Sequence, residues 1–212
     1  MHNKKHFNKK IFAIYVALSF FFLGIFIVIS YFIFGSKIDY YASLINTTAI
    51  KGDSESTTTT IDLETRKITK YPSWGAKYAT INLPTIDLSM PVFYGDSLKI
   101  LKYGVGTFDG AYMPGEGGTI IMPSHNALDG FGKIPGLEKG DKIVVDTTYG
   151  SFEYSVDSYK IVQDTQLDAF PIQDEKEMLI LYTCYPINKS VVGRKTLRYV
   201  VYANRVGGTY EK

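Results

Sequence analysis

The stretch Met178-Leu179-Ile180-Leu181-Tyr182-Thr183-Cys184 is an apolar run of strand length that stops at Tyr185-Pro186. Aliphatic and aromatic side chains in such a run favour a β-strand, and proline is not found inside a central strand. The run also ends on the single cysteine of the chain. A thiol at the end of a strand is held by rigid backbone and can still meet a substrate. This stretch therefore indicates both a β fold and a place for chemistry.

Short runs of the same kind, separated by glycine and proline, lie on both sides of it. Together they predict an all-β domain, a closed antiparallel β-barrel of about eight strands with short helices. A short helix is expected to begin after Asp96 or Ser97 and to end at Lys102, and residues 104–118 are expected to be a glycine-rich loop. The expected strands cover residues 78–83, 88–94, 119–122, 142–146, 152–162, 178–184 and 197–203.

The N-terminal region differs sharply from the rest, because residues 11–34 contain no charged side chain. About 20 apolar residues are enough for a helix to cross a bilayer, whereas the apolar part of a cleaved signal peptide has roughly 7–15. We therefore expect one transmembrane signal anchor, and a buried core helix is the alternative. The lysines at 4, 5, 9 and 10 precede it without any acid, so the positive-inside rule places the N-terminus in the cytoplasm and the domain outside the membrane.

These patterns divide the chain into five parts. Residues 1–10 form a basic cytoplasmic leader and residues 11–34 the anchor. Residues 35–74 are expected to be an extracytoplasmic stalk, with four consecutive threonines at 57–60. The β-barrel is expected over residues 75–206, and residues 207–212 are expected to be a C-terminal tail.

Charge and cysteine content exclude several classes of protein. The 212 residues include 23 basic and 21 acidic side chains, and without the four leader lysines 19 basic side chains remain. This balance is not that of a nucleic-acid-binding protein. One cysteine can form neither an intrachain disulfide nor a zinc site of two or more thiolates. We expect no metal and no organic cofactor.

Three side chains are candidates for catalysis. Outside the leader and the anchor there is one cysteine, Cys184, and one histidine, His125, which follows an expected strand in Met122-Pro123-Ser124-His125-Asn126. A thiol nucleophile needs such an imidazole, and an oxyanion needs a cation. Arg198 would share a face with Cys184 if their strands pair, and Arg194 is the competing arginine. The alternatives are a buried structural cysteine, an ordinary surface histidine and solvated arginines.

Taken together, these motifs resemble those of the sortases, the membrane-anchored cysteine transpeptidases of Gram-positive bacterial surfaces. Ile180-Leu181-Tyr182-Thr183-Cys184 is similar to the family's Thr-Leu-x-Thr-Cys, with Ile180 in place of the first threonine. Ser124 precedes His125 where the family often has glycine. The segment from Val192 to Val201 is similar to the family's arginine strand when Arg198 is aligned. Thr183-Cys184-Tyr185-Pro186, followed by Val192-Gly193, is most similar to class D.

The resemblance implies a function and partners. Cys184 would cleave a sorting motif like Leu-Pro-x-Thr-Gly after threonine and keep the protein as a thioacyl enzyme. His125 would move the protons, and Arg198 would hold the substrate and the oxyanion. The implied partners are secreted proteins with a C-terminal sorting signal and an amine from a lipid-linked peptidoglycan precursor or a pilin lysine.

Two other functions are possible from the sequence. A non-catalytic, membrane-tethered β-barrel binding module would have Cys184 and His125 far apart or buried. A cell-wall transpeptidase of the L,D type would have its histidine close before the cysteine, whereas here 59 residues separate the two.

Overall fold

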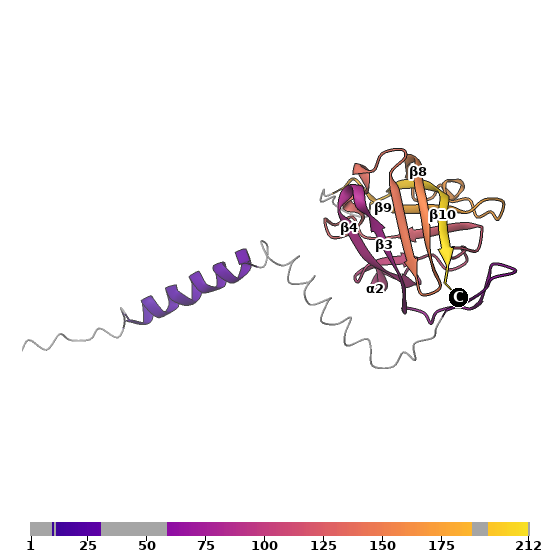
Figure 1. The fold of residues 1–212 in the computed structure, drawn as a ribbon. Coiled ribbons are helices and arrows are strands. Elements are labelled where there is room, and N and C mark those ends of the chain that lie inside the picture. The colour runs from indigo at the N-terminus through magenta and orange to yellow at the C-terminus, as the bar shows by residue number, and fades with distance from the viewer. Residues whose placement is uncertain (1–9, 11, 31–58, 188–194, 212) are drawn as a thin grey trace, which may run out of the picture. The chain divides into compact units, whose positions relative to one another are not determined.

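The computed structural model describes residues 10, 12–30, 59–187 and 195–211, which belong to two compact units (Figure 1). The first unit contains the helix Phe12–Ser30, which is long and apolar enough to cross a membrane. All its residues except Ser30 are exposed, which is compatible with a membrane anchor. The remaining parts of the expected leader, anchor and stalk, residues 1–9, 11, 31–34 and 35–58, lie outside the described residues.

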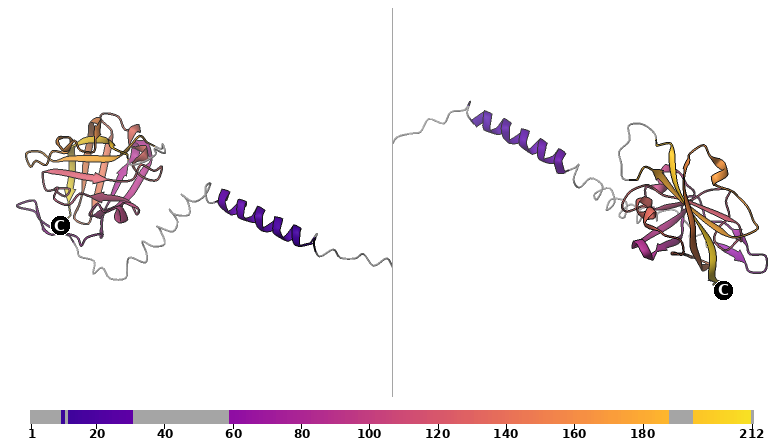
Figure 2. Two further views of the ribbon diagram at one scale, coloured as in Figure 1. Left: turned by 180° about the vertical axis from the view of Figure 1, so that it is seen from behind. Right: turned by 90° about the horizontal axis from the view of Figure 1, so that it is seen from above.

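The second unit is an eight-stranded sheet curled into a nearly closed barrel (Figures 1 and 2). Its strand order is β5-β4-β3-β7-β8-β10-β9-β6, and the amide of Phe108, just after β5, donates to the carbonyl of Ile121 in β6 at 2.9 Å. The barrel consists of β3 (Lys77–Leu83), β4 (Leu88–Tyr94), β5 (Val105–Thr107), β6 (Thr119–Pro123), β7 (Lys142–Thr147), β8 (Gly150–Gln163), β9 (Met178–Tyr185) and β10 (Leu197–Tyr210).

This architecture confirms the predicted all-β barrel, with two refinements. The pairs β4–β5 and β6–β9 are parallel, while the other pairs of the barrel are antiparallel. Strand β5 lies in the stretch expected to be only loop, because three residues are too few to show an alternating pattern. Pro91 fits inside β4 because it precedes Val92, where the pairing with β5 begins.

The short helices lie in the connections. Helix α2 (Leu98–Leu101) begins where the sequence predicts, and the cap is Ser97, whose side chain accepts a hydrogen bond from the Ile100 amide. Within the described residues, the 3-10 helices η2 (Pro84–Ile86), η3 (Phe131–Gly136) and η4 (Leu167–Ala169) accompany it.

The folded unit extends beyond both expected boundaries of the barrel. Strands β1 (Thr60–Asp62) and β2 (Lys67–Lys70) pair within the range expected to be stalk, and Ile68 packs into the barrel core, where its amide donates to Glu116 at 2.8 Å. At the other end, the residues expected to form a tail continue β10 as far as Tyr210. The Tyr210 hydroxyl donates to the Gly115 carbonyl at 2.7 Å. The β1–β2 hairpin and the end of β10 are ordered by contacts with distant residues, and such contacts cannot be read from the local sequence.

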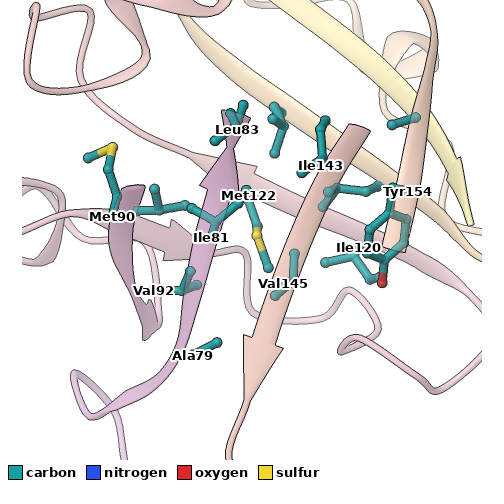
Figure 3. Packing of buried hydrophobic residues seen from close by; sticks show 14 of the residues in the cluster. Ala79, Ile81, Leu83, Met90, Val92, Ile120, Met122, Ile143, Val145 and Tyr154 are labelled. Carbon is teal, nitrogen blue, oxygen red and sulfur yellow. The ribbon is translucent and has the colours of Figure 1, made fainter. Parts of the chain in front are cut away.

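Two hydrophobic clusters lie on opposite faces of the sheet. The larger one fills the barrel, and Figure 3 shows members such as Ile81, Met122 and Val145 pointing into the space between the strands. The smaller one, which we call the outer cluster, consists of Ile121, Val162, Ala169, Ile180 and Val200. Because side chains alternate along a strand, β9 contributes Leu179 and Leu181 to the barrel interior and Ile180 to the outer cluster. Burial on both faces explains its continuous apolar run.

The segment 164–177, which contains η4, covers the outer cluster. The Tyr202 hydroxyl on β10 donates to the Ala169 carbonyl at 2.8 Å, and the rings of Phe170 and Tyr182 meet edge to face with centroids 5.1 Å apart. The outer face of β9 and β10 is therefore packed against segment 164–177. This packing restrains the two strands near Cys184 and Arg198, which lie toward one end of this face.

Candidate active site

Cys184 lies near the end of β9 on the outer face of the barrel. Side chains alternate along a strand, so Cys184 points to the same face as Ile180 and Tyr182, which belong to or pack against the outer cluster. The thiol is free and the residue is only partly buried. The alternative of a fully buried structural cysteine is therefore excluded.

Arg198 stands directly opposite Cys184 in the antiparallel β9–β10 ladder. Directly opposite residues have Cβ atoms about 4.5–5.5 Å apart and project to the same face. The structure thus contains the pairing of the Cys184 strand with the Arg198 strand that the sequence analysis assumed. Arg194, the competing arginine, lies outside the described residues.

The chain itself fixes the Arg198 guanidinium. Its Nη1 donates to the carbonyls of Lys195 and Leu197 at 2.8 and 2.9 Å, and its Nη2 lies 3.5 Å from Asp164 Oδ2. The Arg198 and Asp164 side chains keep 16% and 10% of their exposure. A cation in this partly buried position is held before any substrate arrives, which is what stabilisation of an oxyanion requires.

Asp164 was not recognised from the sequence. It is the first residue after β8, and the register of β8 on β10 pairs Val162 with Arg198. Nothing in the local sequence connects it to an arginine 34 residues later. Only the register of two long strands brings these two side chains together.

The parallel pairing of β6 with β9 brings His125 to the end of the barrel where Cys184 lies. Pro123 pairs with Tyr182, and the Ser124 amide continues the ladder by donating to the Tyr182 carbonyl at 3.2 Å. The register ends with Pro123 and Tyr182, which lie two residues before His125 and Cys184, so the two parallel strands bring both residues to the same end of the barrel. The buried Thr183 hydroxyl donates to the Ser124 carbonyl at 2.8 Å and locks the two strands at this point.

The loop after His125 is anchored to the barrel core. The Phe131 amide donates to the His125 carbonyl at 2.8 Å, and the Phe131 ring is fully buried. Gly130 is required for this contact, because a Cβ at that position would lie 2.6 Å from the His125 carbonyl oxygen. The backbone of His125 is thus fixed although its side chain is exposed.

The surroundings of His125 favour the neutral imidazole. Partial desolvation and the nearby Lys102 ammonium lower the pKa of His125 below its usual 6.5, and the Asp129 carboxylate opposes them. A neutral imidazole can take a proton from a thiol or an amine. The exposed position gives the ring access to both enzyme and substrate atoms.

In the part of the chain that the structure describes, no three His, Cys, Asp or Glu side chains come together as a candidate metal site. The chemistry available at this end of the barrel is that of a thiol, an imidazole and a guanidinium. These groups are suited to acyl transfer through a thioester.

Comparison with known proteins agrees with this chemistry. A family model described as the Sortase domain matches residues 81–206, more than half of the chain. The chain belongs to the sortase family and is a cysteine transpeptidase.

The resemblance to class D is also confirmed. Sortase D of Bacillus subtilis (strain 168) is 33% identical over 154 residues, which cover 73% of this chain and 76% of that protein. The structure of a Clostridium perfringens Sortase D5 transpeptidase shares the fold, with a TM-score of 0.56, 24% identity and coverage of 64% of this chain and 82% of the other. A Clostridium perfringens sortase C, solved with the C-terminal cell wall sorting motif, has a TM-score of 0.56 and 31% identity, covering 63% of this chain and 72% of the other.

Proposed function

We propose that this sortase cleaves a sorting signal like Leu-Pro-x-Thr-Gly or Leu-Pro-x-Thr-Ala after threonine and transfers the protein to an amine. The observation that carries the proposal is the direct cross-strand pair of Cys184 and Arg198, and β6, which ends two residues before His125, supports it by leading to the same end of the barrel. The structure of a related sortase C with the C-terminal cell wall sorting motif supports the class of substrate.

The proposed reaction has two acyl transfers. Neutral His125 takes the proton of the Cys184 thiol and becomes an imidazolium, the thiolate attacks the threonine carbonyl, and the oxyanion that forms is held by Arg198. The C–N bond then breaks, the leaving amine takes a proton from the His125 imidazolium, and a thioester to Cys184 remains. An incoming amine attacks the thioester and gives a proton back to His125, and Cys184 leaves as thiolate.

The N-terminal helix supports a location at the cell membrane. The lysines before it support a cytoplasmic N-terminus and a barrel outside the membrane. A membrane-held barrel would meet secreted proteins with apolar C-terminal tails and lipid-linked peptidoglycan precursors at one surface. The acceptor amine proposed is that of such a precursor or of a pilin lysine.

The test uses the full chain in detergent micelles, because β1 and β2 contribute to the fold and a fragment from residue 75 would lack them. The protein is incubated with Leu-Pro-x-Thr-Gly and Leu-Pro-x-Thr-Ala peptides and an amine, and the products are read by intact mass. We expect a thioacyl adduct and a ligated peptide, both absent in Cys184→Ala.

Because Cys184 is the only cysteine, any thiol adduct reports this site alone. Release or transfer of peptide that persists in Cys184→Ala would overturn the proposed mechanism. A wild-type protein that is silent across a wide panel of such peptides, although its Cys184 reacts with a thiol reagent, would overturn the proposed substrate class.

A further inference from the structure

The residue after His125 makes a contact that the acyl-transfer chemistry does not use. The side-chain amide of Asn126 donates to the Cys184 carbonyl at 2.9 Å and to the Pro186 carbonyl at 3.0 Å. Both acceptors belong to the segment that carries the nucleophile. Only the NH₂ group of the amide can serve two carbonyl oxygens, so the orientation of this side chain is fixed by its partners.

The contact has a clear place in the β6–β9 ladder. In a parallel ladder every second residue of one strand donates its amide to the neighbouring strand. The Ser124 amide donates to Tyr182, so the next rung would be the Asn126 amide donating to Cys184. The structure puts the side-chain Nδ2 of Asn126 in that position. The side chain thus completes the ladder while the backbone of β6 turns away toward the His125 loop.

The second acceptor of Asn126, the Pro186 carbonyl, extends the link from Cys184 to the turn that follows it. The Pro186 carbonyl also accepts from Lys195 Nζ at 2.9 Å, so the turn after Cys184 is held from the β6 side and from the β10 side. Asn126 thereby links three parts of the site: the His125 loop, the Cys184 backbone and the turn toward β10. Thr183 and Ser124 form the other lock between the same strands, one residue earlier.

We propose that Asn126 is a positioning residue, which sets the distance and orientation between the His125 imidazole and the Cys184 thiol through its two hydrogen bonds. The proposal rests on the proposed function for its activity readout, since it concerns the same pair of groups. Asn126 touches no reacting atom. A misplacement of reacting groups by about 1 Å can cost on the order of a hundredfold in rate, so loss of this link has a measurable effect.

The test compares Asn126→Ala and Asn126→Leu with the wild type and with Asn82→Ala, all as full chains in detergent. Asn126→Leu keeps nearly the shape of the side chain and adds no charge but has no hydrogens to donate, which separates loss of the bonds from loss of volume. Asn82 is the matched control because its amide also makes two side-chain hydrogen bonds, to Asp146 and Ser89, on β3, which three strands separate from β9. We expect both Asn126 variants to lower kcat by roughly ten- to a hundredfold with little change in KM, and Asn82→Ala to keep wild-type kinetics.

A second readout does not depend on the peptide substrate. The rate of Cys184 alkylation by iodoacetamide is measured against pH in the wild type, in the Asn126 variants and in His125→Ala. If Asn126 holds the imidazole at the thiol, the pH profile of the Asn126 variants shifts toward that of His125→Ala. A general loss of stability would lower occupancy of the fold without shifting the profile.

Each outcome decides the inference. Wild-type kcat and an unchanged alkylation profile in folded Asn126 variants would overturn it. Equal losses in Asn126→Ala and Asn82→Ala would also overturn it, since the effect would then be structural. If the wild type processes no peptide at all, the proposed function fails, and the alkylation profile alone decides the role of Asn126.

Discussion

Two arginine–carboxylate pairs lie on the same strand, β10, one at each end of the barrel. At the far end from the cysteine, Arg205 Nη1 lies 2.7 Å from Glu177 Oε2, and the Glu177 side chain keeps 4% of its exposure. At the cysteine end, Arg198 and Asp164 are 3.5 Å apart. One strand thus carries two arginines, each paired with a carboxylate from another segment, in two different settings.

Both charged groups of the Glu177–Arg205 pair have several further interaction partners. The Glu177 carboxylate accepts from the amides of Gly115 and Gly117 and from the Tyr154 hydroxyl, and the Arg205 guanidinium lies over the Phe152 ring, 5.0 Å from its centroid. Burial and the neighbouring carboxylate raise the pKa of Tyr154 well above its usual value, so it remains a hydrogen donor at working pH. The nearly buried Glu177 carboxylate has no room for a further ligand. This pair ties the loop before β6 to β8 and β10.

The Arg198 pair is looser and beside a half-buried thiol. Its partners are two backbone carbonyls and one longer contact to Asp164. We infer that the short, fully satisfied pair stabilises the barrel, whereas the longer pair at a strand end is the one to which the proposed function assigns a catalytic role. The predictions below test this division, beginning with the largest expected effect.

Glu177→Gln is expected to destabilise the barrel. Removing one partner from a buried ion pair costs about 3–5 kcal/mol because the other charge stays buried without compensation. The measurement is the free energy of unfolding from urea titrations followed by circular dichroism. Glu153→Gln is the matched control, because Glu153 forms an exposed pair with Lys142 and should contribute about 0–1 kcal/mol. Equal losses in the two variants would contradict the structural role of the Glu177 pair.

Arg198→Lys is expected to lower activity while leaving stability nearly unchanged. A lysine keeps the charge but cannot reproduce the planar set of donors, and loss of one oxyanion donor costs about 10²–10³ in kcat. The same substitution at Arg205 should lower stability and leave kcat near the wild-type value below the unfolding transition. Peptide-transfer kinetics and urea titrations on both variants give the answer. Arg198→Lys with wild-type kcat would remove Arg198 from the catalytic role.

Thr183→Val tests the lock between β6 and β9. Valine has nearly the same shape but no hydroxyl, so the Ser124 carbonyl loses its donor, at a cost of about 1–3 kcal/mol in unfolding free energy. Thr183→Ser keeps the donor and should recover most of the loss. A Thr183→Val protein as stable as the wild type would show that this bond does not hold the two strands together.

The smallest expected effect concerns the titration of His125. Lys102→Gln removes a charge that lowers the pKa of His125 and should raise it, whereas Asp129→Asn should lower it. The pKa of His125 in the folded state lies below the unfolded value of 6.5, so protonation of this imidazole favours the unfolded chain. The stability that neutral His125 contributes is therefore lost as the pH falls below about 6.5 and through the folded-state pKa. Imidazole chemical shifts against pH measure both changes. Shifts of the same sign in the two variants would contradict the electrostatic explanation.

The fold and the candidate residues were largely accessible from the sequence, because the strands carry strong apolar patterns and the chain has one cysteine. The face shared by Cys184 and Arg198 followed from strand parity once the two strands were assumed to pair. Asp164 and Asn126 were not identified, since each acts through a register or a loop that only the folded chain defines. The β1–β2 hairpin and the end of β10 were missed because their order comes from Glu116 and Gly115 rather than from local apolar content.

The parallel pairing of β6 with β9 also has a consequence for how this protein becomes active. Two parallel neighbours cannot be joined by a tight turn, and here the connection contains the whole β7–β8 hairpin and the segment over the outer cluster. The loop entropy of closing about 59 residues must be overcome before the strands that lead to His125 and Cys184 can pair, and contacts of such long range form slowly. A nascent or partly folded chain therefore carries the Cys184 thiol before β6 has paired with β9. Under the proposed function, acyl transfer would begin only when the barrel is complete.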